Sequence, residues 1–188
     1  MKLKMITTAL AAAMSLSLSA EMKLGTVDLM LLVKNHPNYE SNKTLLKSTD
    51  KDYQKKLEVI KSEGDKLQEE GKKLMEQMRN PMLAAKAKAD VEKQLTDLQQ
   101  KLFGIEQRYR SEAMRCRQDL QDLEGRLLRT TTDDLRKRIA KYATAKGYDL
   151  IVDSNAAAYA AKSLDVTDEM LKELGVDPKE AKGRDEGK

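Results

Sequence analysis

Two long runs with a seven-residue apolar repeat dominate this sequence, and a single Asn80-Pro81 step separates them. In each run the repeat advances by alternating steps of four and three, which places one narrow stripe along a helix. The first stripe comprises Tyr53, Leu57, Ile60, Gly64, Leu67, Gly71, Leu74 and Met78, and the second Val91, Leu95, Leu98, Leu102, Ile105 and Tyr109. Proline lacks an amide hydrogen and disfavours helical backbone at the preceding residue, so the chain is expected to fold back there. We predict an antiparallel helical hairpin, a coiled-coil arm over residues 42–119 with its tip near residues 80–81.

The two helices are predicted to have different lengths, because the first spans about residues 42–79 and the second about 82–146. Ser41 or Asn42 is the expected N-cap of the first. A turn at 80–81 pairs residues whose numbers sum to about 161, so the first helix would be used up near Asp119. The apolar residues beyond that point would then need another surface to cover them; they are Leu120, Leu123, Leu127, Leu128, Leu135 and Ile139.

The arm is predicted to be flexible. Gly64 and Gly71 occupy stripe positions, and glycine within a helix costs about 1 kcal/mol relative to alanine. The repeat also slips between Tyr109 and Leu120, and such a slip unwinds a supercoil locally.

Short strands are expected at both ends of the hairpin, at residues 22–28, 148–153 and 156–161, followed by a helix at 168–174. Gly147 is expected to end the second long helix. Residues 21–41 and 120–175 would form a β-rich body, and residues 176–188 a disordered tail. Three short strands with open edges make a poor independent domain, which predicts a body shared between copies of the chain. The candidate oligomerisation residues are Val27, Leu127, Leu135, Ile139, Leu150, Ile151 and Val152.

Residues 1–20 have the layout of a cleavable signal peptide, with Lys2 and Lys4 before a short apolar run and small residues at its end. Two cleavage positions remain open, one after Ser19 and one after Ala20. The formal charge of +4 falls to about +2 without Lys2 and Lys4, so global basicity argues for no partner. An exported protein with a single cysteine has no internal disulfide framework.

The residues that usually carry catalysis are sparse. His36 is the only histidine and is expected to be a loop residue beside Pro37, which argues against a zinc cluster or a catalytic triad. Cys116 is expected to be a small packing residue, and Asp28 and Asp153 are expected to be turn residues at strand ends. We therefore expect no enzymatic activity, cofactor or metal.

The tip combines positive charge with flexible apolar side chains, which suits an acidic or membrane-emerging client, or anionic lipid headgroups. The same pattern also fits a solvated helix face around a turn. The candidate binding residues are Lys72, Lys73, Met75, Arg79, Met82, Leu83, Lys86 and Lys88. A second basic cluster (Arg108, Arg110, Arg115 and Arg117) has acidic neighbours and no stacking aromatics, so nucleic-acid binding is not expected.

The segment Tyr148–Leu174 (YDLIVDSNAAAYAAKSLDVTDEMLKEL) resembles the closing segment of the Skp/OmpH family of periplasmic chaperones. Residues 151–156 (IVDSNA) match the end of the family's strand, and residues 166–172 (VTDEMLK) match its following helix. Residues 24–28 (LGTVD) are similar to the family's first strand.

This resemblance implies a periplasmic homotrimer with a small β body and three helical arms that cage unfolded outer-membrane β-barrel proteins without ATP. It also implies a lipopolysaccharide contact on the arms, which this sequence does not assign to residues. Two alternatives remain open. One is a structural coiled-coil scaffold or adaptor of the envelope with a fixed partner, and the other is a protein of anionic lipid surfaces.

Overall fold

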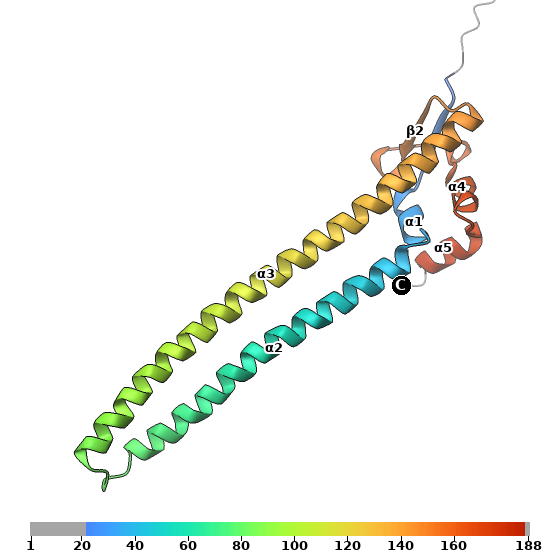
Figure 1. Ribbon diagram of the computed structural model, residues 1–188. Coiled ribbons are helices and arrows are strands. Elements are labelled where there is room, and N and C mark those ends of the chain that lie inside the picture. Colours follow the sequence, from blue (N-terminus) through green and yellow to red (C-terminus); the bar gives the residue numbers. More distant parts are fainter. Residues whose placement is uncertain (1–21, 187–188) are drawn as a thin grey trace, which may run out of the picture.

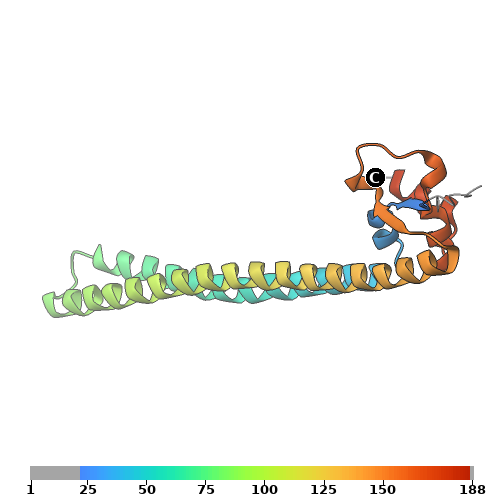
Figure 2. The same ribbon diagram turned by 90° about the horizontal axis from the view of Figure 1, so that it is seen from above.

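The computed structural model describes residues 22–186 and consists of a long helical hairpin with a small body at one end (Figure 1). Helices α2 (Tyr39–Met78) and α3 (Ala85–Lys146) form the hairpin. Seen from above, the hairpin is a thin rod and every other element gathers at its base (Figure 2). The predicted fold, mainly α with a small β body, is confirmed. The proposed signal peptide, residues 1–20, lies outside the described residues.

The fold-back lies where the sequence predicts it. Helix α2 ends at Met78, and the turn that follows is fixed by Asn80, whose side-chain oxygen accepts a hydrogen bond from the backbone N–H of Met82 at 3.0 Å. Helix α3 begins at Ala85, three residues later than predicted. The turn is therefore longer than the Asn80-Pro81 step.

This longer turn overturns the predicted register of the hairpin. Gly64 faces Ile105 and Gly71 faces Leu98, so opposed residue numbers sum to about 169 rather than 161. The first helix is not used up near Asp119, because its beginning reaches Thr131, whose hydroxyl lies 3.4 Å from the amide nitrogen of Asn42. Leu120, Leu123 and Leu127 thus lie alongside α2 instead of needing a separate surface.

The seven-residue repeat does form the seam between α2 and α3. The seam residues that are buried are Ile60, Gly64, Gly71, Leu74, Val91, Leu98 and Cys116. Near the tip, Leu74, Val91 and Leu98 form one apolar cluster with partly buried neighbours, among them Met78 and Leu83. Elsewhere along the arm the buried seam residues do not join into a continuous core.

Among the described residues, the body contains two parallel strands rather than the three predicted. Strand β1 (Leu24–Val27) pairs with β2 (Leu150–Asp153), with Leu24 opposite Leu150. The predicted strand at residues 156–161 is wrong. The Asp153 carboxylate accepts a hydrogen bond from the N–H of Asn155 and turns the chain into a 3₁₀ segment, Ser154–Ala156. A second 3₁₀ segment, Lys162–Leu164, follows.

The core of the body is built from helix α1 (Leu29–Lys34), the end of α3 and helix α4 (Thr167–Glu173). Leu32, Leu135, Met170 and Leu171 are fully buried in it. Gly147 ends α3 with a φ of 68°, in the left-handed region that glycine favours, as predicted. Because the core includes Leu135, the hairpin and the body share one packed junction.

Two boundary predictions are wrong. Residues 178–186 form helix α5 (Pro178–Glu186) where a disordered tail was predicted, because the small Ala181 is fully buried against the core and Lys182 pairs with Asp168 at 2.7 Å. Residues 187–188 lie outside the described residues. The first long helix begins at Tyr39, so Ser41 and Asn42 lie inside it and do not cap it.

Candidate functional site

The predicted tip residues divide into an exposed set and a packed set. Met75 and Met82 are exposed, and Met82 is the most exposed large apolar side chain of the described residues at 89%. Leu83 is half-buried because it packs against the tip cluster. The basic residues Lys72, Lys73, Arg79 and Lys86 are exposed, while Lys88 is half-buried. The tip therefore presents positive charge and flexible Met side chains at the far end of the arm.

Charge pairing reduces the basic character of the arm, including one residue of the tip. Lys72 pairs with Glu69 one turn earlier, which raises the pKa of Lys72 through their hydrogen bond. Of the arginine cluster, Arg108 pairs with Glu63 across the hairpin, Arg110 with Glu106 and Arg115 with Asp119. These pairs agree with the expectation that the arginines do not form a nucleic-acid surface, which stays a prediction.

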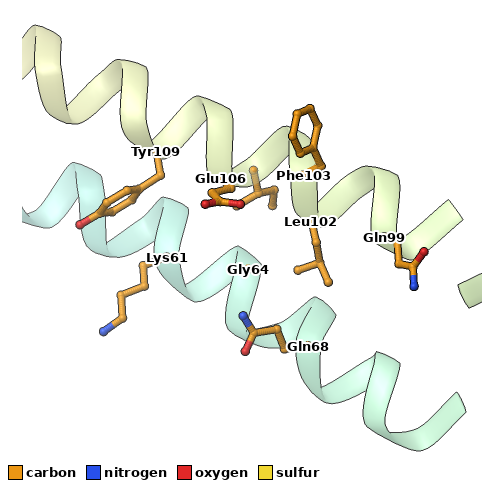
Figure 3. A pocket seen from close by; sticks show the side chains of 9 residues that line it. Lys61, Gly64, Gln68, Gln99, Leu102, Phe103, Glu106 and Tyr109 are labelled. Atoms are coloured by element: carbon orange, nitrogen blue, oxygen red, sulfur yellow. The ribbon is translucent and has the colours of Figure 1, made fainter. Parts of the chain in front are cut away.

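A groove opens midway along the arm between α2 and α3, with a volume of about 640 Å³ (Figure 3). Its lining residues are Lys61, Gly64, Gln68, Gln99, Leu102, Phe103, Ile105, Glu106 and Tyr109. In the close view, Tyr109 and Leu102 reach from α3 toward α2, and Gly64 faces them without a side chain (Figure 3). Phe103 stands at the rim and is 64% exposed. Sequence reasoning placed Gly64 in the seam but missed the groove, because the groove depends on the register.

The candidate oligomerisation residues also divide. Val27 and Leu135 are buried within the body of this one chain, and Ile139 and Ile151 pack against the same core. Leu127 and Val152 are half-buried, whereas Leu150 on β2 is 50% exposed. Within the described residues β2 pairs only with β1, so Leu150 lies on a strand with a second edge available. Of this set, Leu150 is therefore the residue best placed to meet another chain.

His36 links the base of the arm to α3, a role that its position beside Pro37 did not indicate. Its Nε2 lies 3.1 Å from the Asp134 carboxylate, and its Nδ1 accepts a hydrogen bond from the N–H of Asn38 at 3.1 Å. Arg138 Nε also donates to Asp134, at 2.7 Å. The hydrogen bonds from Arg138 and His36 hold the pKa of Asp134 below its ordinary value. Together these residues fasten the start of α2 to the end of α3.

Cys116, Asp28 and Asp153 occupy structural positions. Cys116 is buried in the seam, and burial raises the pKa of its thiol. Asp28 caps α1 through a hydrogen bond from the N–H of Leu31 at 2.9 Å, and Asp153 turns the chain after β2. Burial disfavours the thiolate that a nucleophilic cysteine needs.

Two kinds of feature are absent from the part of the chain that the structure describes. No cluster of three or more histidine, cysteine, aspartate or glutamate side chains there is placed to hold a metal ion. No helix among those residues is both long enough and apolar enough to cross a bilayer.

The sequence matches the model of one protein family over most of its length. The model described as "Outer membrane protein (OmpH-like)" matches residues 23–174, which is most of the chain. This chain belongs to the OmpH-like family. The match includes both strands, the whole hairpin and helix α4, whereas α5 follows it. A comparison with curated proteins gave no match.

Membership of the OmpH-like family confirms the resemblance that the terminal motifs indicated. It suggests a chaperone-type role and binding of outer membrane proteins. A packed body with a slender arm fits such a role, because an extended arm offers a large contact surface.

Proposed function

We propose that this chain is an ATP-independent periplasmic holdase. It holds unfolded outer-membrane β-barrel proteins between flexible helical arms and so keeps them from aggregating. The observation that carries the proposal is the arm: two long helices joined by a narrow, interrupted seam, with exposed apolar side chains along it. Weak contacts at several points give avidity without one tight site, so a client can leave without an energy source. We infer binding rather than catalysis.

The proposal includes assembly into a homotrimer through the body. The features that support assembly are the second edge of β2 and the large side chains exposed near it, among them Met22, Leu24 and Leu150. An unpaired strand edge offers a row of hydrogen-bonding groups to another chain. Three arms around a common body would enclose a space for a client.

The test is an aggregation assay on the chain from residue 21 onward, combined with a measurement of its mass in solution. We expect protection of several unrelated urea-denatured β-barrel proteins at a few subunits per client, and a mass of three chains. A monomer at micromolar concentration that protects no client would refute the holdase. Protection of one protein alone would instead indicate an adaptor with a fixed partner.

Contact with anionic lipid or lipopolysaccharide surfaces is a separate part of the proposal, supported by the exposed basic residues of the tip. Flotation with anionic liposomes tests it. Binding should decrease when Lys73, Arg79 and Lys86 are changed to glutamine, because basic residues near a membrane contribute about 1 kcal/mol each. Absence of flotation at moderate salt would remove the lipid contact and leave the holdase intact.

A further inference from the structure

The two helices of the arm are attached to the body in different ways. Helix α3 runs into the body as one continuous helix, and its residues Leu135 and Tyr142 are buried in the core there (Figure 1). Helix α2 instead begins at Tyr39, after a short turn that follows α1. We call this turn, residues 35–38, the α1–α2 joint. It is the place where α2 can move relative to the body while α3 stays anchored.

The ring of His36 holds the α1–α2 joint together. The side chain is buried, and its two nitrogens contact two different elements. Nδ1 accepts a hydrogen bond from the backbone N–H of Asn38 at 3.1 Å, and Nε2 lies 3.1 Å from the Asp134 carboxylate on α3. A backbone N–H can only donate, so Nδ1 must be unprotonated and the proton of the neutral ring must be on Nε2. The joint as observed therefore needs a neutral histidine in one tautomer.

The start of α2 has few other polar contacts with the body. Among the described residues, the Asn38 side chain accepts no hydrogen bond from the first turn of α2. The backbone N–H of Tyr39 donates to the carbonyl of His36 at 2.8 Å, which ties α2 to the turn itself. The amide nitrogen of Asn42 lies 3.4 Å from the Thr131 hydroxyl, which is long for a hydrogen bond. Loss of the bond from Asn38 to His36 would therefore loosen this end of the helix.

A second proton on the His36 ring is incompatible with that bond. The added proton would go to Nδ1, where the N–H of Asn38 already points, and two donors cannot share a hydrogen bond. The bond from Nε2 to Asp134 would instead become stronger, because it would join opposite charges. Protonation should therefore keep His36 on α3 and release Asn38 at the start of α2.

Charged residues lie on each helix around the α1–α2 joint. Asp134 contacts the ring, and Arg138 Nε donates to Asp134 at 2.7 Å. Helices α4 and α5 both contact α1, and Lys182 of α5 pairs with Asp168 of α4. The charged residues are Lys34 on α1, Glu40 on α2, Asp134 and Arg138 on α3, Asp168 on α4, and Glu180 and Lys182 on α5. Carboxylates ordinarily change charge near about pH 4 and amines above about pH 10, whereas histidine does so between about pH 5 and 8.

We propose that the α1–α2 joint is a pH-sensitive hinge, in which protonation of His36 at Nδ1 breaks its hydrogen bond with Asn38 and loosens the base of the arm. At neutral pH the start of α2 is fixed to the body. In mild acid it moves more freely while α3 stays anchored. This inference concerns the motion of the arm and stands whether or not the chain is a holdase.

The wild-type chain gives the first test, in the assembly that it forms in solution. His36 is the only histidine, so nuclear magnetic resonance of the chain labelled with ¹⁵N-histidine reports its ring without overlap. We expect a neutral ring protonated on Nε2 at about pH 7.5 and protonation of both nitrogens by about pH 5.5. Over the same range, hydrogen exchange corrected for its intrinsic pH dependence should show an about fivefold loss of protection at residues 38–42, as expected for one hydrogen bond.

Two variants separate the roles of the two ring nitrogens. The His36→Asn variant places an amide oxygen near the position of Nδ1, so it offers Asn38 an acceptor that does not titrate. The His36→Gln variant places an amide group near the position of Nε2, so it can donate to Asp134 but offers Asn38 no acceptor. We expect residues 38–42 to be protected at both pH values in His36→Asn and weakly protected at both in His36→Gln. Far-ultraviolet circular dichroism verifies that both variants fold.

The hinge is supported if protection follows the titration of the ring in wild type and loses its pH dependence in both variants. A ring that stays neutral down to about pH 5 would overturn it. Equal protection in the two variants would also overturn it, because the bond from Asn38 to position 36 would then not hold the joint. A loss of protection in acid that persists in His36→Asn would assign the effect to another group and refute the role of His36.

Discussion

The body and the arm of this molecule are packed in different ways. The four large side chains that are fully buried among the described residues all lie in the body: Leu32, Leu135, Met170 and Leu171. The arm is about two-thirds of the described chain, yet its seam contains two buried glycines and a buried cysteine, and its apolar cluster lies near the tip. The body thus has a small conventional hydrophobic core, whereas the two helices of the arm are held together along one narrow row of buried residues.

This difference separates stability from adaptability. Segments with few buried contacts open locally at a lower free energy than the core around which the chain folds. An arm that opens locally can adjust to clients of different shapes while the body stays folded. The hydrogen bonds of His36, Asp134 and Arg138 lie at the boundary, where opening of the arm must stop if the body is to remain intact.

The largest expected effect is a loss of stability, and it distinguishes the packed core of the body from the seam of the arm. Leu135→Ala removes a fully buried side chain from the body and should lower the free energy of unfolding by about 2–5 kcal/mol. Leu98→Ala in the seam should cost less, because water can enter the space that it leaves. Urea unfolding followed by circular dichroism measures both. A larger loss for Leu98→Ala would contradict the comparison, since the arm would then hold the stability.

Cys116 tests whether the arm opens before the body does. Its thiol is buried in the seam and its pKa is raised, so a thiol reagent should modify it at least about tenfold more slowly than it does in the urea-unfolded chain. The rate should rise at urea concentrations at which the body remains folded. The near-ultraviolet circular dichroism, to which the stacked Tyr142 and Tyr148 rings of the body contribute, follows the packing of the aromatic side chains independently of the thiol. Modification that begins only when this signal disappears would show one cooperative unit.

Replacing a seam glycine with alanine should raise the free energy of unfolding, by less than the amount that Leu135→Ala lowers it. Gly64→Ala should raise the free energy of unfolding by about 1 kcal/mol, because alanine favours the helix and its methyl group meets only Ile105, at an ordinary distance. Gly71→Ala should raise the free energy of unfolding by less, because its methyl group would lie 3.1 Å from Leu98 and the Leu98 side chain must shift. Thermal unfolding of the two variants side by side measures the difference. Equal gains would mean that Leu98 moves aside freely.

Much of the fold follows from local signals in the sequence. The seven-residue repeat predicted the seam, and the proline step predicted the fold-back. Gly147 predicted the end of α3. Each of these features depends on residues close together in the chain.

The wrong predictions concern features that are determined by contacts between residues far apart in the sequence. The turn took up residues on both sides of Asn80-Pro81, and this lengthening shifted every opposed pair of residues along the arm. Residues 156–161 read as a strand because small residues follow a turn signal, but the Asp153 cap set a 3₁₀ turn instead. Helix α5 depends on Ala181 reaching the core, and one alanine among charged residues gives no periodic signal. The link from His36 to Asp134 joins residues 98 positions apart, which no local pattern indicates.

The smallest expected effect is electrostatic and lies at the boundary between arm and body. The pKa of Asp134 is held below its ordinary value of about 4 by hydrogen bonds from Arg138 and His36, so folding favours its charged form. The stability that this provides is complete above the ordinary pKa and is lost as the pH falls below about 4 toward the folded pKa. Asp134→Asn should therefore lower the free energy of unfolding at neutral pH by under about 1 kcal/mol, since the carboxylate is partly exposed. The difference from wild type should disappear in acid.

Asp133→Asn is the matched control, because among the described residues Asp133 pairs along its own helix, with Arg136 at 3.4 Å. It should leave the stability unchanged within error at both pH values. Urea unfolding at neutral pH and at a series of pH values from about 4 down to about 2 compares the three chains. A loss in Asp134→Asn that persists in acid would assign the effect to the shape of the side chain and not to its charge. A loss of equal size in Asp133→Asn would show that the link from His36 to Asp134 does not fasten the arm to the body.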